Sequence, residues 1–206
     1  MKKSIFKEGK KYTFRDYFDL PNPTEEIINE LGYSYSLGII ELPKSENCDI
    51  HSIQNLKDNY YKVLPKINLD SEAAKREFLI APILFEVAKS TDSKISVEYQ
   101  IEIDDKLSGY MDYLIRSKQE IVIIEAKKGD IDKGFNQLAA ELIALDKYED
   151  ENNNLLYGAI TIGEMWRFSI LNRKTKHITK DIHSFTVPED VEIIFRILVG
   201  ITEFTI

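Results

Sequence analysis

The segment from Leu107 to Lys128 constrains the fold of this chain most strongly, because it predicts two strands joined by a short polar turn. The first strand, Ser108 to Arg116, is rich in aromatic and branched residues. The second strand, Ile121 to Ile124, is an unbroken apolar run, which is typical of a strand covered on both faces. The segment therefore predicts a hairpin inside a layered protein.

Charged residues interrupt this apolar pattern at a few positions that stand close together in a hairpin. Asp112 lies inside the first strand, and Glu125 and Lys127 close the second. Side chains alternate along a strand, so Glu125 and Lys127 share one face, and in a paired hairpin Asp112 can lie across from Glu125. Burying an unpaired carboxylate is costly. These residues are therefore expected to be paired, solvated at a cleft or bound to a cation.

Two carboxylates beside an ammonium group form a compact site with a recognisable chemistry. Carboxylate oxygens suit a hard divalent cation such as Mg²⁺, for which Mn²⁺ can substitute. The lysine can hold a phosphate oxygen or a developing hydroxide. Metal-assisted hydrolysis of a phosphodiester needs these parts.

Asp112 followed by Glu125-Ala126-Lys127 after an apolar strand resembles the bipartite motif of the PD-(D/E)XK nuclease superfamily. Met111 replaces the proline that usually precedes the aspartate. The strings KREFLIAPIL, LSGYMDYLI, IVIIEAKKGDIDKGFNQLAAELIAL and LYGAITIGEMWRF resemble a group of largely uncharacterised bacterial members, and also the nuclease domain of type I restriction motor subunits. The resemblance covers roughly residues 71–166. It implies a restriction-endonuclease-like core and a metal-dependent nuclease activity.

The resemblance also implies roles for residues outside the central motif. In the superfamily the first core helix often adds a glutamate to the metal site, and the match to KREFLIAPIL gives that role to Glu77, with Glu72 second. Gln137 matches a glutamine that contacts the scissile phosphate or the attacking water. Each has an ordinary alternative: Glu77 can be a surface residue paired with a neighbouring Lys or Arg, and Gln137 a polar residue beside an apolar stripe.

The elements around the motif predict an α/β protein with a central mixed sheet between helices. Pro82 is expected to kink the first of these helices, because it lacks a backbone donor. Residues 1–69 are expected to form an accessory segment packed on a core of residues 70–206. The predicted core elements follow the order helix, strand, strand, strand, helix, strand (αβββαβ), over residues 70–89, 95–103, 108–116, 121–124, 130–148 and 155–162.

Length and composition are those of a soluble globular domain with an acidic balance. The chain has 206 residues and a formal net charge of −8. It shows no apolar run long enough to span a bilayer. Its only cysteine, Cys48, excludes a disulfide framework and favours the cytoplasm.

The acidic charge counts modestly against a nucleic-acid partner, although a local basic surface is what matters. One short segment is rich in basic residues, and it predicts either such a surface or a solvated hairpin; its members are Arg173, Lys174, Lys176, His177, Lys180 and His183. Lys127, Lys128 and Lys133 flank the motif.

The sequence favours a Mg²⁺-dependent deoxyribonuclease in a restriction, defence or repair setting, in which Asp112, Glu125 and Glu77 hold the metal. Lys127 would act on the attacking water, and Gln137 would orient the substrate. The alternative is a non-catalytic nucleic-acid-binding or assembly module of the same fold, and a third hypothesis is a protein-interaction domain with an ordinary Asp112–Lys127 salt bridge. The sequence leaves open whether the substrate is DNA or RNA and whether it is duplex or single-stranded. It also leaves open whether the protein acts alone, as a homodimer or as a subunit of a larger complex.

Overall fold

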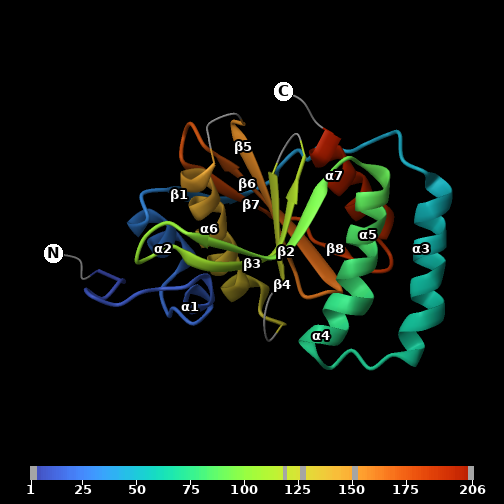
Figure 1. Cartoon of the computed structure of the whole chain (residues 1–206), viewed down its shortest axis with the longest axis horizontal. Helices are drawn as coiled ribbons and strands as arrows, with labels where there is room; N and C mark the ends of the chain where they lie inside the picture. The colour runs from blue at the N-terminus through green and yellow to red at the C-terminus, as the bar shows by residue number, and fades with distance from the viewer. Residues whose placement is uncertain (1–3, 118–119, 126–128, 150–152, 204–206) are drawn as a thin grey trace.

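The computed structural model describes residues 4–117, 120–125, 129–149 and 153–203. Within them, the chain forms a mixed sheet with the strand order β1-β7-β6-β5-β4-β3-β2, and β8 pairs with β6 (Figure 1). The β1–β7 and β4–β5 pairs are parallel, and the other pairs are antiparallel. The strands are β1 Ser34–Gly38, β2 Lys94–Glu102, β3 Ser108–Arg116, β4 Glu120–Glu125, β5 Leu155–Thr161, β6 Met165–Asn172, β7 His177–Asp181 and β8 Phe185–Thr186.

Helices cover both faces of the sheet, and each face has its own apolar cluster. One group of helices is α1 Phe14–Phe18, α2 Thr24–Glu30 and α6 Ile131–Tyr148. The other group is α3 Ile50–Val63, α4 Glu72–Lys75, α5 Ala81–Ser90 and α7 Val191–Glu203, and Figure 1 shows the two groups on opposite sides of the strands. The predicted α/β protein with a central mixed sheet between helices is confirmed.

Helix α6 is the central element of the first cluster, and its sequence explains why it forms there. Asp130 caps it, since its carboxylate accepts a hydrogen bond from the Lys133 backbone N–H at 3.0 Å. The helix then buries an unbroken run from Gly134 to Leu145 between the sheet and the N-terminal helices. The sequence predicts a cap at Asp130 or Asp132 and an end near Tyr148; the structure has Asp130 as the cap and Tyr148 as the last helical residue.

The helical stretch from Glu72 to Ser90 changes its winding in the middle. Residues Arg76–Ile80 form a π-helical segment between α4 and α5, and Pro82 is the second residue of α5. Proline has no N–H and its ring crowds the carbonyl of the residue four positions earlier, so the chain widens here instead of continuing as an α-helix. The sequence predicts a kink at Pro82; the structure has a π segment that contains Arg76 and Glu77 directly before α5.

The β2–β3 hairpin twists so sharply that its two halves contact different clusters. Tyr113 and Ile115 belong to the cluster of α5 and α7, whereas Leu107 and Met111 belong to the cluster of α1 and α6. All four are odd-numbered positions in β3 or directly before it, and they would share one face if the strand were regular. The switch lies at Asp112.

The partner strand changes at the same level. The register pairs Val97 with Tyr113 and Tyr99 with Met111, so Glu98 stands at the level of Asp112. Glu98 has a backbone φ of 52°, a left-handed conformation that is uncommon outside glycine. The twist thus brings Asp112 to the boundary between the two clusters.

The N-terminal residues pack on the rest of the chain in three places. Helices α1 and α2 contact α6, β1 forms one edge of the sheet beside β7, and α3 packs against α5 and α7. Helix α2 begins directly after Pro23, and β1 begins directly after Tyr33. The apolar residues near the C-terminal end form α7, and no helix among the described residues is long and apolar enough to cross a membrane.

Candidate active site

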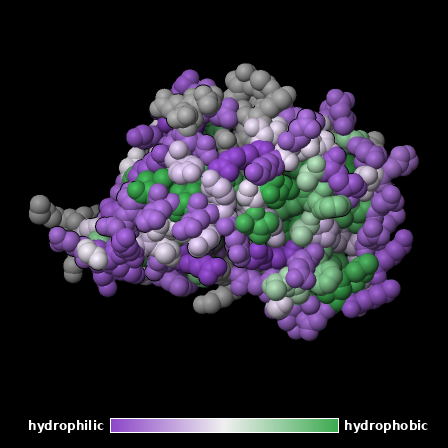
Figure 2. Space-filling model, in the orientation of Figure 1, coloured by the Kyte–Doolittle hydropathy of each residue, from purple (hydrophilic) through white to green (hydrophobic). Residues whose placement is uncertain are grey.

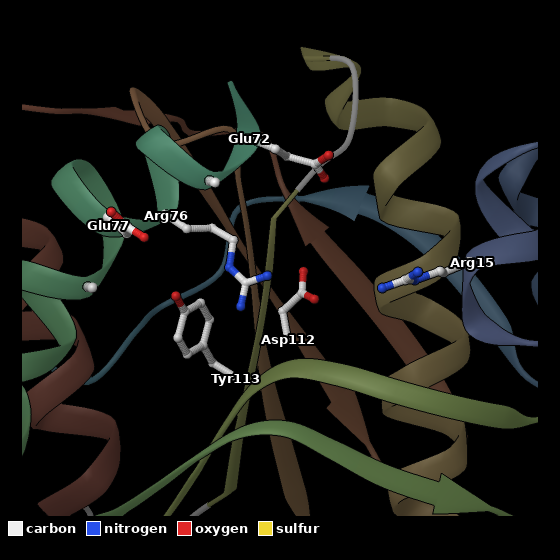
Figure 3. A pocket seen from close by; sticks show the side chains of 8 residues that line it. Arg15, Glu72, Arg76, Glu77, Asp112 and Tyr113 are labelled. Atoms are coloured by element: carbon white, nitrogen blue, oxygen red, sulfur yellow. The ribbon is translucent and has the colours of Figure 1, made fainter. Parts of the chain in front are cut away.

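A cavity of about 540 Å³ opens beside Asp112, where the hairpin twists. Its walls come from four parts of the chain: α1, the α4–π segment, the start of α5, and β3. Figure 3 shows the charged side chains of these walls gathered around a shared hollow. The lining residues are Arg15, Glu72, Ala73, Arg76, Glu77, Ala81, Asp112 and Tyr113.

Two arginines accompany the Asp112 carboxylate. Figure 3 shows the guanidinium of Arg76 on one side of Asp112 and that of Arg15 on the other, both pointing towards it. Arg76 also lies over the Tyr113 ring, 5.6 Å from its centroid. The half-buried carboxylate therefore lies between two guanidinium groups, whose positive charge also attracts anions.

The two helix glutamates predicted for the site both line this cavity, in different places. The Glu72 carboxylate projects towards the side where Asp112 lies, whereas the Glu77 carboxylate lies beyond the Arg76 side chain (Figure 3). The π segment produces this arrangement, since it begins between these two residues. Of the two, Glu72 is the better placed to act together with Asp112.

The second half of the predicted motif is described only in part. The backbone of Glu125 ends β4, beside Thr161 of β5, and Tyr113 pairs with Ile123, so the expected β3–β4 hairpin is present. Lys127 lies outside the described residues, as do Ala126 and Lys128. The grouping of Asp112 with Glu125 and Lys127 therefore stays a prediction.

Gln137 lies away from the cavity surface. It is buried in α6, and its side-chain amide donates a hydrogen bond to Oε1 of Glu141 at 3.0 Å. It is not among the residues that line the cavity. The arrangement matches the ordinary alternative, a polar residue beside an apolar stripe, more closely than a contact with substrate.

A second cavity, of about 380 Å³, continues from the first one on the other side of Asp112. Arg15 and Asp112 line both cavities, so the two form one groove. The new wall is the distal half of the hairpin together with the start of α1. Its other lining residues are Thr13, Phe14, Glu98, Gly109 and Tyr110.

Sequence reasoning missed Arg15, Arg76 and Glu98. Arg15 stands 97 positions before Asp112, in a segment with no recognisable motif. Arg76 lies beside Glu77 in the KREFLIAPIL string, which offered a local signal that a cation would accompany the helix carboxylates. Glu98 could have been found from the hairpin register once the pairing of the two strands was assumed.

The described side chains supply part of a cation site. Among the residues that the structure describes, no three His, Cys, Asp or Glu side chains come close enough to hold a metal ion together. Asp112 and Glu72 offer oxygen donors of the type that Mg²⁺ takes, and Mg²⁺ keeps several waters when only one or two carboxylates bind it. The donor chemistry therefore fits a partly hydrated Mg²⁺.

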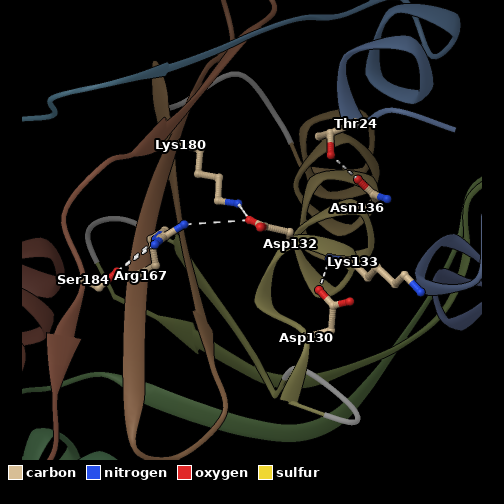
Figure 4. Close-up of polar contacts among 8 residues, drawn as sticks. All are labelled: Thr24, Asp130, Asp132, Lys133, Asn136, Arg167, Lys180 and Ser184. Atoms are coloured by element: carbon tan, nitrogen blue, oxygen red, sulfur yellow. Dashed lines mark hydrogen bonds and ion pairs between the residues drawn. The ribbon is translucent and has the colours of Figure 1, made fainter. Parts of the chain in front are cut away.

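The basic segment of residues 173–183 forms the turn and second strand of the antiparallel β6–β7 hairpin, as one of the two predictions held, and its turn is exposed at Lys174 and Lys176. It does not form a continuous basic surface, because two of its cations are buried. Arg173 is buried against Asp146, with Nε 2.6 Å from Oδ1, and Lys180 is buried with its ammonium 2.5 Å from Oδ1 of Asp132 (Figure 4). The Lys180 contact lowers the pKa of Asp132, while burial lowers the pKa of Lys180 itself. Two of the predicted cations thus hold helix α6 to the sheet.

The remaining contacts in this region are also structural. Arg167 lies 3.8 Å from Asp132 and donates hydrogen bonds to Ser184, and Thr24 donates to Asn136 across the α2–α6 contact (Figure 4). Lys174 and Lys176 are exposed.

Comparison of the chain with protein-family models, curated proteins and solved structures found no match.

Proposed function

We propose that the protein is a metal-dependent nuclease with a restriction-endonuclease-like core, which hydrolyses phosphodiester bonds in DNA. The observation that carries the proposal is the position of Asp112. It is a carboxylate inside a strand, held at the twist of a hairpin, and it faces a groove that also presents two arginines and two glutamates. A carboxylate for a cation and guanidinium groups for an anion suit a metal-bound phosphodiester.

The order of the elements supports the same proposal. The helical stretch Glu72–Ser90 precedes an antiparallel β2–β3–β4 meander, and α6 then crosses over to β5, which runs parallel to β4. This is the αβββαβ order that the resemblance implies, and it sets Asp112 and the end of β4 on neighbouring strands.

In the proposed site Asp112 and Glu125 hold Mg²⁺, with a helix carboxylate, Glu72 or Glu77, completing the set directly or through water. The bound ion supplies a water of lowered pKa and neutralises charge on the phosphate. Arg15 and Arg76 bind phosphate oxygens and favour the extra negative charge of the transition state. Lys127 positions the attacking water or takes part in its deprotonation.

The test is cleavage of plasmid and single-stranded circular DNA with Mg²⁺, with Mn²⁺ and with EDTA. We expect wild-type protein to cut in either metal and to stop in EDTA. Asp112→Asn keeps the shape of the side chain and should reduce cleavage by at least about a hundredfold, since metal chemistry supplies several kcal/mol of the barrier reduction.

Asp92→Asn is the matched control, because Asp92 is an exposed carboxylate outside the cavity. It should cut like wild type. Cleavage by Asp112→Asn at the wild-type rate would refute the site, and activity that survives EDTA would refute the metal. Protein that binds DNA in Ca²⁺ but never cuts in Mg²⁺ would instead be the non-catalytic module.

A further inference from the structure

The start of the chain is basic, in contrast to the acidic whole. Six of its first fifteen residues are Lys or Arg and one is Glu, whereas the full chain carries a net charge of −8. Lys7, Lys10 and Lys11 are exposed in the structure. Figure 2 shows hydrophilic residues gathered at the end of the molecule where this segment lies. Lys10 Nζ lies 3.5 Å from Oδ1 of Asp16 and Lys11 Nζ lies 3.8 Å from Oδ1 of Asp105, but the two lysine side chains are 49% and 76% exposed, and such solvated pairs are weak. The segment therefore presents basic side chains that an anion can reach.

The fold holds this segment against the tip of the β2–β3 hairpin. The Tyr12 N–H donates to the Asp105 carbonyl at 2.7 Å, the Ser108 hydroxyl donates to the Tyr12 carbonyl at 3.1 Å, and the Tyr17 hydroxyl donates to the Lys106 carbonyl at 2.8 Å. The Tyr12 and Tyr17 side chains are buried. The basic side chains are consequently presented from a fixed backbone.

Arg15 stands at the inner end of the segment, in α1, and it lines both cavities of the groove. Thr13 and Asp16 fix the start of this helix, since the Asp16 carboxylate accepts hydrogen bonds from the Thr13 N–H at 2.7 Å and hydroxyl at 2.8 Å. The structure gives the exposed Arg15 side chain no hydrogen bond or ion pair with any residue that it describes. Its guanidinium is therefore available to an anion in the groove.

An aromatic ring shares this part of the groove. Tyr110 lines the second cavity together with Arg15 and is 51% exposed. The neighbouring Gly109 has a φ of 136° and packs on Phe14, so the backbone that carries Tyr110 lies directly on α1. An exposed ring and a guanidinium group that line the same cavity can together contact a ligand that has both an anionic group and a flat aromatic face.

We propose that residues 7–15 and Tyr110 form the substrate-binding wall of the site, and that the substrate they take is single-stranded nucleic acid. This inference rests on the proposed nuclease function and names its substrate class. Lys7, Lys11 and Arg15 contact successive phosphates, with Arg15 next to the reacting one, and Tyr110 stacks on an unpaired base.

The pairing of a basic track with an open ring distinguishes single strands from duplexes. Proteins that bind single strands combine cations along the backbone with aromatic side chains on which bases stack. In a duplex the bases are already stacked on one another, so an exposed ring at the end of a phosphate track has nothing to contact.

The experiment measures the dissociation constants of fluorescent oligo(dT), oligo(U) and a DNA hairpin duplex in Ca²⁺ over a series of salt concentrations. Wild type should bind the single strands at least about tenfold more tightly than the duplex. Tyr110→Ala should weaken single-strand binding by about fivefold or more, since stacking on one ring contributes that much per base, and Tyr110→Phe should restore it. Arg15→Gln should weaken binding and reduce the slope of log K against log salt by about 0.7, the value for one phosphate contact on a single strand.

Tyr61→Ala and Lys62→Gln on α3 are the matched controls, because Tyr61 is 52% exposed and both lie outside the groove. They should leave binding unchanged. If wild type binds single strands and neither Tyr110→Ala nor Arg15→Gln weakens that binding, the inference is overturned and the nuclease proposal still stands. Preferential binding and cutting of the duplex would have the same two consequences. Binding that follows the expected pattern without cleavage in Mg²⁺ would support the inference and refute the nuclease chemistry, and no nucleic-acid binding at all would refute both.

Discussion

Replacing Arg173 by glutamine should destabilise the protein severely, although the residue belongs to a segment that looks like a surface. The Arg173 side chain is 6% exposed, and its Nε lies 2.6 Å from Oδ1 of Asp146, whose side chain is 11% exposed. It also donates to the carbonyls of Asp146 at 3.0 Å, Glu149 at 2.7 Å and Asn153 at 3.2 Å. Arg173 thus binds the last turn of α6, where carbonyls lack helical partners.

The magnitude follows from what the substitution leaves behind. Removing one partner of a buried ion pair typically costs about 3–5 kcal/mol, because the other charge stays buried. The other oxygen of Asp146 accepts a hydrogen bond from the Tyr33 hydroxyl at 2.6 Å, which offsets part of the loss. We therefore expect a decrease of about 3 kcal/mol in the free energy of unfolding, and a melting temperature about 6–12 °C lower for a chain of this length.

Urea and thermal unfolding of Arg173→Gln, Asp146→Asn, the double variant and Lys174→Gln would measure this. Lys174 is the adjacent exposed cation and should change stability by less than about 0.5 kcal/mol. The double variant should be less destabilised than the sum of the two single ones, since the pair is coupled. If Arg173→Gln unfolds like Lys174→Gln, the residue is a surface cation after all, and the reasoning fails.

Three further outcomes can be tested by similar means. Glu98→Val should lower the free energy of unfolding by about 1–2 kcal/mol in urea titrations, because φ is 52° at this position and a β-branched residue is strained there even though valine favours strands. Glu98→Gly should stay within about 1 kcal/mol of wild type. Gly200→Ala should lower the free energy of unfolding by about 1–3 kcal/mol in the same assay. The added Cβ would lie 2.6 Å from the Pro43 carbonyl oxygen and 2.8 Å from the Lys44 Cα, and backbone atoms cannot rotate away as a side chain can. A stability equal to wild type would show that α7 is not packed on this segment. Burial raises the pKa of Asp16, but its hydrogen bonds from Thr13 and its contact with Lys10 outweigh this, so that its pKa is lowered. A lowered carboxyl pKa stabilises the fold above the unfolded value near 4 and loses that effect as pH falls through the folded value, so melting temperatures measured below pH 4 should fall more for wild type than for Asp16→Asn.

Local sequence signals were sufficient for the elements around the site. The bounds of β3 and α6 follow from patterns that neighbouring residues complete among themselves: a β-rich run before a polar turn, and Asp130 as the cap of a long apolar stripe. Pro82 likewise disturbs its helix by its own geometry, although the sequence did not indicate that the result would be a π segment. Such features depend on residues that are close together in the sequence, which is why they could be predicted.

The site depends on contacts that no local signal contains. Arg15 and Asp112 line the same cavity because α1 packs on the hairpin. Arg173 and Lys180 are not surface cations because Asp146 and Asp132 of α6 pair with them. The sequence shows the basic residues of 173–183, but it does not show the carboxylates that pair with two of them, because these carboxylates lie on helix α6. Basic residues in the sequence become a basic surface only where the fold does not bury them against carboxylates, and this condition depends on tertiary contacts.

The twist of the hairpin explains why a carboxylate is tolerated inside strand β3. A regular strand would have turned Asp112 into an apolar cluster, where an ionised carboxylate is costly. The switch between clusters at Asp112, with the left-handed Glu98 at the same level, opens the strand at this one point to the groove and to two guanidinium groups. A strand that only needed to be stable could have carried an apolar residue and a regular twist. The irregular backbone and the half-buried charge at the boundary between the two halves of the core are therefore both consistent with the proposed site.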